Sequence, residues 1–123
     1  KEVPEDIIKL MILNQVPQAL KEIQEQTGGI DAESAFSLPY AFEVNPPGIT
    51  KANTLQNLLK EMDLSGLPVF TVGDGENDLS MFAHSKKCFA PTSAHPAVLE
   101  QADRVINREK NGLLRPILDD ILT

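Results

Sequence analysis

Apolar positions in the first third of the chain form short runs and one amphipathic stretch. Residues 7–13, IIKLMIL, are almost wholly apolar and too few for a typical helix, so they predict a buried strand. The segment 17–29, PQALKEIQEQTGG, predicts a helix, because a proline opens it, apolar residues share one face and a glycine pair ends it. The segment 34–44, SAFSLPYAFEV, is rich in aromatic residues and predicts one strand, or two strands interrupted at Pro39.

From Lys51 onward the pattern alternates between helix and strand. Residues 51–64, KANTLQNLLKEMDL, predict a helix with leucine and methionine at i, i+3, i+4 and i+7. Further strands are predicted at 68–72, 86–91 and 104–106, and further helices at 78–84, 95–102 and 112–122, the last with a bend at Pro116. Strands separated by single helices predict right-handed crossovers and a parallel sheet. The loop NPPGIT at 45–50 is the predicted boundary between a domain at 1–47 and a domain at 48–123.

Charge and composition narrow the function classes. The 123 residues carry a formal charge of −7, and the largest cationic cluster is the pair Lys86-Lys87, which argues against a nucleic-acid partner. No apolar run approaches the roughly 20 residues of a membrane helix, and no signal peptide is visible, so a cytoplasmic protein without a membrane partner is expected. The single cysteine, Cys88, predicts a buried thiol in a reducing compartment. The chain begins KEVPED without methionine, which suggests part of something longer.

Three carboxylates crowd the segment 71–82, TVGDGENDLSMF, where a predicted strand ends. Asp74, Glu76 and Asp78 fall within five residues, and such a cluster requires open water or a cation. Ligands of parallel sheets gather at the carboxyl ends of the strands, and Gly73 and Gly75 allow a tight turn there. Hard oxygen ligands beside free helix N–H groups suit Mg²⁺ with phosphate.

The same segment also allows simpler interpretations. Gly-Asp-Gly alone is most often a structural turn, but helix capping would use one carboxylate and not three. An EF-hand calcium loop also places acids at alternate positions. It needs Gly at its sixth position and Glu at its twelfth, where this chain has Leu79 and Ser85, so this interpretation is rejected.

Three strings together resemble a known family. They are GITKANTLQNLL at 48–59, VFTVGDGENDLSMF at 69–82 and CFAPTSAHPAVLEQADRVI at 88–106. They resemble the C-terminal part of haloacid dehalogenase-like (HAD) phosphatases, in particular the Cof-type sugar-phosphatase group, where a helix-opening lysine precedes GDxxND. The resemblance implies an α/β fold class: a partial Rossmann-like HAD core, with a parallel sheet and flanking helices, at 48–123, plus the remnant of an α/β cap at 1–47.

The resemblance also implies roles for individual residues. Lys51 matches a catalytic lysine that steadies the phosphate and the negative charge of the nucleophile. Asp74 matches a carboxylate that binds Mg²⁺, and Asn77 matches the residue that binds the substrate phosphate. Asp78 matches a catalytic support residue, near the metal or bonded to the lysine. Glu76 occupies a variable place and is expected to be solvated.

The remaining polar residues of the region are less informative. Ser93 stands where the family has asparagine, so no role is transferred to it. His84 and His95 are expected to be surface or structural residues.

The nucleophile of the family, the first aspartate of a DxDGT-like motif, has no match in the chain. Asp103, Asp119 and Asp120 do not follow predicted strands, and the phosphate-binding Ser or Thr is missing as well. The resemblance therefore implies a phosphorylated small-molecule substrate, an aspartyl-phosphate route, and an N-terminal half of the same protein that supplies the nucleophile. These 123 residues alone are expected to be inactive, with an unpaired sheet edge prone to aggregation.

Two hypotheses from other classes stand beside the phosphatase. A non-catalytic module would fold against a partner chain that supplies the missing strands, and its acidic loop would be disordered or turned away from any cleft. A receiver-like signalling domain would place its acidic partners on an earlier loop, an arrangement that this sequence lacks.

Overall fold

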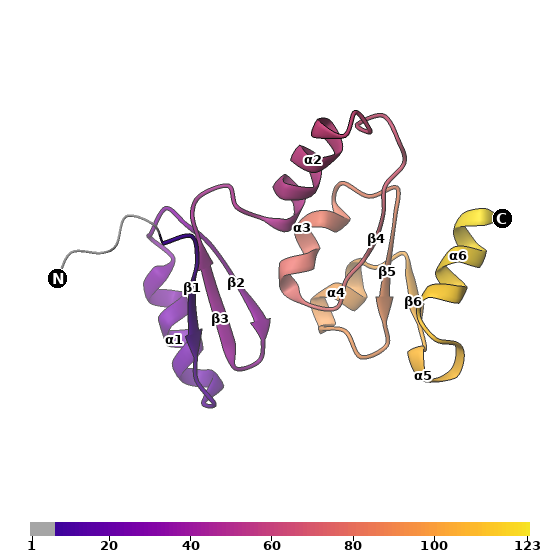
Figure 1. Cartoon of the computed structure of the whole chain (residues 1–123). Coiled ribbons are helices and arrows are strands. Elements are labelled where there is room, and N and C mark those ends of the chain that lie inside the picture. The colour runs from indigo at the N-terminus through magenta and orange to yellow at the C-terminus, as the bar shows by residue number, and fades with distance from the viewer. Residues whose placement is uncertain (1–6) are drawn as a thin grey trace.

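The fold contains two three-stranded sheets that lie side by side (Figure 1). The structure is a computed structural model and describes residues 7–123. The first sheet is antiparallel, in the order β1-β3-β2, and the second is parallel, in the order β4-β5-β6. Residues 1–6 of the predicted first domain lie outside the described residues. The predicted domain boundary after residue 47 stays a prediction, although the segment there does connect the two sheets.

The antiparallel sheet comprises β1 (Leu10–Leu13), β2 (Glu33–Leu38) and β3 (Ala41–Asn45), with α1 (Pro17–Thr27) packed against β3. The aromatic-rich segment therefore forms two strands, a hairpin whose turn contains Pro39. Phe36 and Phe42 face each other across the hairpin, with ring centroids 5.2 Å apart. Phe42 and Leu20 of α1 are fully buried and form the centre of this layer.

The prediction of a buried strand at 7–13 is wrong in its bounds and in its burial. Only residues 10–13 form a strand, and all but Ile12 of these side chains are exposed. Ile8 just before it is 83% exposed. The physical reason is position: within the described residues β1 pairs only with β3 and forms the edge of the sheet. Its apolar run therefore lies at a rim and not in the core.

The parallel sheet confirms the predicted fold class. Its strands are β4 (Phe70–Val72), β5 (Lys87–Pro91) and β6 (Arg104–Ile106). The flanking helices are α3 (Leu79–Phe82), α4 (Pro96–Gln101), α5 (Arg108–Asn111) and α6 (Leu114–Leu122). The short helix α5 was not predicted. Pro116 lies in the first turn of α6, where the missing N–H removes no helical hydrogen bond.

The central strand β5 separates two apolar clusters. Successive side chains of a strand point to opposite faces, and here Cys88 and Ala90 pack with α3 and α4. Phe89 packs on the other face with Ile106 of β6 and Ile117 of α6. The burial of Cys88 confirms that part of the prediction for this thiol.

The helix α2 (Lys51–Glu61) follows the loop that joins the sheets, and it packs against α3. The Thr50 hydroxyl accepts a hydrogen bond from the Asn53 N–H at 3.1 Å, which fixes the start of the helix. Lys51 is therefore held in the first turn. The predicted apolar stripe is only partly buried, because Leu58 and Met62 are exposed.

None of the helices within residues 7–123 combines the length and apolar character that crossing a membrane requires.

Substitution of Phe89 by alanine tests the packing of the parallel sheet. Because this side chain is fully buried in the sheet's centre, Phe89→Ala is expected to lower the free energy of unfolding by about 3–5 kcal/mol, measured by urea denaturation. The control is Leu114→Ala, at a side chain that is 70% exposed, which is expected to change it by about 0.5 kcal/mol or less. Equal effects of the two substitutions would contradict this packing.

Candidate functional site

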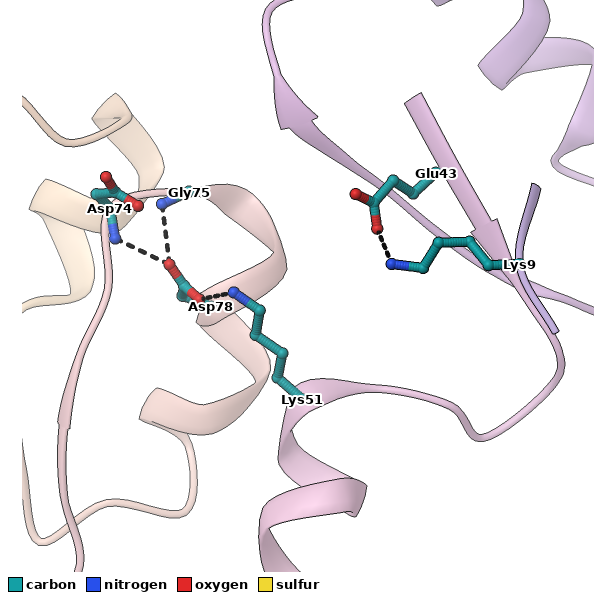
Figure 2. Close-up of polar contacts among 6 residues, drawn as sticks. All are labelled: Lys9, Glu43, Lys51, Asp74, Gly75 and Asp78. Atoms are coloured by element: carbon teal, nitrogen blue, oxygen red, sulfur yellow. Dashed lines mark hydrogen bonds and ion pairs between the residues drawn. The ribbon is translucent and has the colours of Figure 1, made fainter. Parts of the chain in front are cut away.

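The acidic turn between β4 and α3 is organised around one buried carboxylate. Asp78, the last residue of the 3₁₀ turn η1 (Glu76–Asp78), is 5% exposed. Its Oδ1 lies 2.5 Å from Lys51 Nζ, and its Oδ2 accepts hydrogen bonds from the N–H groups of Asp74 at 2.9 Å and Gly75 at 3.1 Å (Figure 2). A single side chain thus joins the start of α2 to the turn that follows β4.

Gly73, which directly follows β4, leaves room for the Asp78 carboxylate. A Cβ at Gly73 would lie 2.4 Å from the Asp78 Cβ and 2.9 Å from its Cγ. The Gly73 N–H also donates to the Phe89 carbonyl at 3.1 Å, so the backbone cannot easily move away. Gly73 is therefore required by the close approach of the Asp78 side chain, whereas the sequence analysis expected it for a tight turn.

Asp78 is ionised because its contacts outweigh its burial. Burial raises its pKa, while the hydrogen bond from Lys51 and those from the Gly75 and Asp74 N–H groups lower it. The net result is a pKa below the ordinary aspartate value. Both oxygens of this carboxylate are engaged by protein donors, and the Lys51 side chain remains 47% exposed beside it.

The other two carboxylates of the turn have different surroundings. Asp74 is exposed, and within the described residues no hydrogen bond or ion pair engages its carboxylate. Glu76 was expected to be solvated, but its Oε1 lies 3.4 Å from His95 Nε2. The His95 N–H also donates to the Asp74 carbonyl at 2.8 Å. His95 therefore has the structural role that was expected of it, and that role is to hold the acidic turn from the side of α4.

Sequence reasoning missed this link between the turn and the start of α4. His95 also caps α4, since its Nδ1 accepts a hydrogen bond from the Ala97 N–H at 3.3 Å. The only signal in the sequence was its position before Pro96, which favours a helix start. His84, by contrast, contacts Gln56 of α2 at 2.6 Å and does not contact the turn.

A cleft of about 710 Å³ lies between the antiparallel sheet and the turn. Lys51, Glu76 and Asn77 line one side, and Lys9, just before β1, and Glu43 of β3 line the other. Strand β2 packs against η1, so the first sheet closes over the acidic turn. Glu76 and Asn77 of the turn face this cleft, whereas neither Asp74 nor Asp78 lines it.

The residues of the turn do not form a complete metal site by themselves. Within residues 7–123 no group of three or more His, Cys, Asp or Glu side chains is arranged to hold a metal ion. Asp74 offers an exposed carboxylate of the kind that Mg²⁺ prefers, whereas Asp78 is buried and already accepts three hydrogen bonds from protein donors. The structure joins Lys51 to the backbone of Asp74 through the Asp78 carboxylate, and Asn77 lies in the same turn.

Comparison with known proteins identifies the family. The family model of haloacid dehalogenase-like hydrolases matches residues 1–117. The chain belongs to this family. Membership confirms the resemblance to haloacid dehalogenase-like hydrolases on which the sequence analysis rests. A HAD/COF-like hydrolase from Plasmodium vivax is similar in fold, with a TM-score of 0.79 and 23% identity. That comparison covers 94% of this chain and 42% of the other.

Two curated relatives of this HAD-like chain are named as phosphatases. The 5-amino-6-(5-phospho-D-ribitylamino)uracil phosphatase YbjI of Escherichia coli is 31% identical over 108 residues, which is 87% of this chain and 39% of that protein. A phosphoglycolate phosphatase of Halorubrum lacusprofundi is 31% identical over 87 residues, which is 71% of this chain and 37% of that protein. The chain therefore spans less than two fifths of the length of these relatives.

The steric role of Gly73 can be tested on stability. Gly73→Ala is expected to lower the free energy of unfolding by about 1–3 kcal/mol, because the added methyl group collides with the Asp78 side chain. Gly29→Ala is the matched control, since nothing lies within 4 Å of a Cβ there, and it should be neutral or slightly stabilising. If both variants unfold at the same urea concentration as the parent, the close approach is wrong.

The Lys51–Asp78 contact has a pH signature. Because the folded pKa of Asp78 lies below the unfolded value of about 3.9, its contribution to stability is present above that pH and is lost as the pH falls through the folded pKa. Removal of the lysine by Lys51→Met is expected to raise the Asp78 pKa, measured by carboxyl ¹³C NMR titration. Lys21→Met on α1 serves as control. An Asp78 pKa that is the same in Lys51→Met and in the parent would refute the contact.

Proposed function

We propose that this chain is part of a Mg²⁺-dependent phosphatase that hydrolyses a small phosphorylated metabolite of the sugar-phosphate kind. The observation that carries the proposal is the Asp78 bridge, which holds the Lys51 ammonium group beside the Asp74 turn at the rim of a cleft. Family membership and the phosphatase names of two relatives support the same reaction class.

Lys51 is the proposed catalytic cation. Its Nζ contacts Asp78, yet half of the side chain stays exposed and lines the cleft, so the ammonium group can also donate to a phosphate oxygen. Phosphoryl transfer depends mainly on positioning and on stabilisation of negative charge, which a fixed ammonium group supplies. Asp78 acts by fixing both the lysine and the turn, and Asn77, on the same turn and lining the same cleft, is the proposed donor to the substrate phosphate.

Asp74 is the proposed protein ligand of Mg²⁺. Its carboxylate is exposed, and the Asp74 backbone is held on two sides, by Asp78 at its N–H and by His95 at its carbonyl. Asp78 was also predicted as a metal ligand, and its Oδ1, which accepts one hydrogen bond, is the atom proposed for that role. When bound, Mg²⁺ would offset the phosphate charge and hold the phosphate in line. The remaining ligands would come from water, substrate and a carboxylate outside these 123 residues.

The nucleophile is proposed to lie in another segment of the same protein. Three of the aspartates outside the turn have structural partners: Asp103 accepts a hydrogen bond from the Cys88 N–H, Asp119 pairs with Arg115, and Asp120 pairs with Lys87. The transfer would thus form an aspartyl phosphate on a residue supplied from elsewhere. Within the described residues β4 pairs only with β5, so its other edge is available for an additional strand.

The proposal is tested on the full-length protein that contains this chain. With Mg²⁺ and p-nitrophenyl phosphate, Asp74→Asn and Lys51→Ala are each expected to lower kcat/KM by about 100-fold or more, because each removes a charge that stabilises the transition state. Asp74→Asn should also raise the Mg²⁺ concentration at half-maximal rate.

Two controls accompany that experiment. Glu61→Gln, at an exposed position on α2, should retain the parent rate, and the 123 residues on their own should give no turnover. If the full-length protein hydrolyses no phosphate ester in a Mg²⁺-dependent manner, the proposed function is wrong.

A further inference from the structure

An ion pair on the first sheet faces the candidate site. Lys9 Nζ lies 2.7 Å from Glu43 Oε2 of β3, and both residues line the same cleft as Lys51 and Asn77. Figure 2 shows the charged ends of this pair pointing toward the Lys51–Asp78 pair. The Glu43 side chain is only 14% exposed, so its orientation toward the cleft is set by the fold and not by free rotation in solvent.

Glu43 carries its charge in this position. The hydrogen bond from Lys9 is the largest of several effects that hold the pKa of Glu43 below its ordinary value; burial opposes it, and Ser37 and Lys51 add to it. A carboxylate and an ammonium group therefore stand side by side, opposite the proposed phosphate site.

The charges around the cleft are unevenly divided. The lining contains the cations Lys9 and Lys51 and the anions Glu33, Glu43 and Glu76. If Lys51 binds the phosphate group, Lys9 and the three glutamates remain to contact the rest of the substrate. Uncharged polar groups such as those of Ser34, Asn45 and Thr54 complete the lining.

These surroundings discriminate between leaving groups. A neutral leaving group with neighbouring hydroxyls can donate to the Glu43 carboxylate and accept from the Lys9 ammonium group, so it satisfies both partners at once. A leaving group with a second negative charge would meet the Glu43 carboxylate at short range, where like charges repel. Discrimination of this kind combines an attractive contact with a repulsive one.

We propose that Glu43, held by Lys9, selects a neutral, hydroxyl-bearing leaving group and rejects one that carries a second anionic group. The proposal rests on the proposed function, because it assigns the leaving-group end of the same site. A purely structural role is the competing explanation, since the pair also fastens the segment before β1 to β3.

The test compares two small esters with the full-length protein. Glycerol 3-phosphate has two hydroxyls on its leaving group, and 2-phosphoglycolate has a carboxylate. The parent is expected to prefer glycerol 3-phosphate by about tenfold or more in kcat/KM. Glu43→Gln should reduce this preference by about fivefold or more, mainly through a lower KM for 2-phosphoglycolate, and Glu43→Lys should invert it. Glu22→Gln on α1 is the matched control and should preserve the parent ratio.

The outcomes separate the inference from the proposed function. A structural role would change the midpoint of thermal unfolding and the rates with both esters alike, and an unchanged ratio in Glu43→Gln and Glu43→Lys would overturn the inference. The same ratio is measured without turnover, from calorimetric dissociation constants of the corresponding non-hydrolysable phosphonates. If the protein hydrolyses no ester, the proposed function fails, and the shift of this binding ratio in the two variants decides the inference alone.

Discussion

The structure depends on one carboxylate that accepts hydrogen bonds from three donors in two parts of the chain. Asp78 binds the Lys51 ammonium group and the N–H groups of Asp74 and Gly75, at a position that is almost fully buried. A buried charge is tolerated only when its partners satisfy it, so the lysine and the turn must both be in place. This requirement connects the start of α2 to the end of β4 and creates a site where the sequence has only separate motifs.

The two sheets contribute different residues to the site around Asp78. The parallel sheet supplies the acidic turn at the carboxyl end of β4, where α/β folds collect their ligands. The antiparallel sheet closes over that turn through β2 and contributes a second set of charges, Lys9 and Glu43, to the cleft. Phosphate chemistry and leaving-group recognition would therefore come from different layers of the same molecule.

Local patterns predicted much of the fold, and tertiary contacts account for what they missed. The spacing of apolar residues located α1, α2 and the alternating units of the parallel sheet, and the GDGEND string located the turn. The exposure of β1 could not be predicted, because a short apolar run has the same sequence pattern in an exposed edge strand as in a buried strand. The Lys9–Glu43 and Glu76–His95 contacts join residues far apart in sequence, where local periodicity carries no information.

The central claim is that Asp78 positions Lys51 beside a site for a divalent cation and a phosphate group at Asp74. A crystal structure of the full-length protein with Mg²⁺ and orthovanadate, a mimic of the phosphoryl group, tests it most directly. The account predicts the cation on the Asp74 carboxylate and a vanadate oxygen within hydrogen-bond distance of Lys51 Nζ, with the contacts of Asp78 to the turn retained. Vanadate and cation bound away from Asp74, with Lys51 contacting neither vanadate nor Asp78, would contradict it.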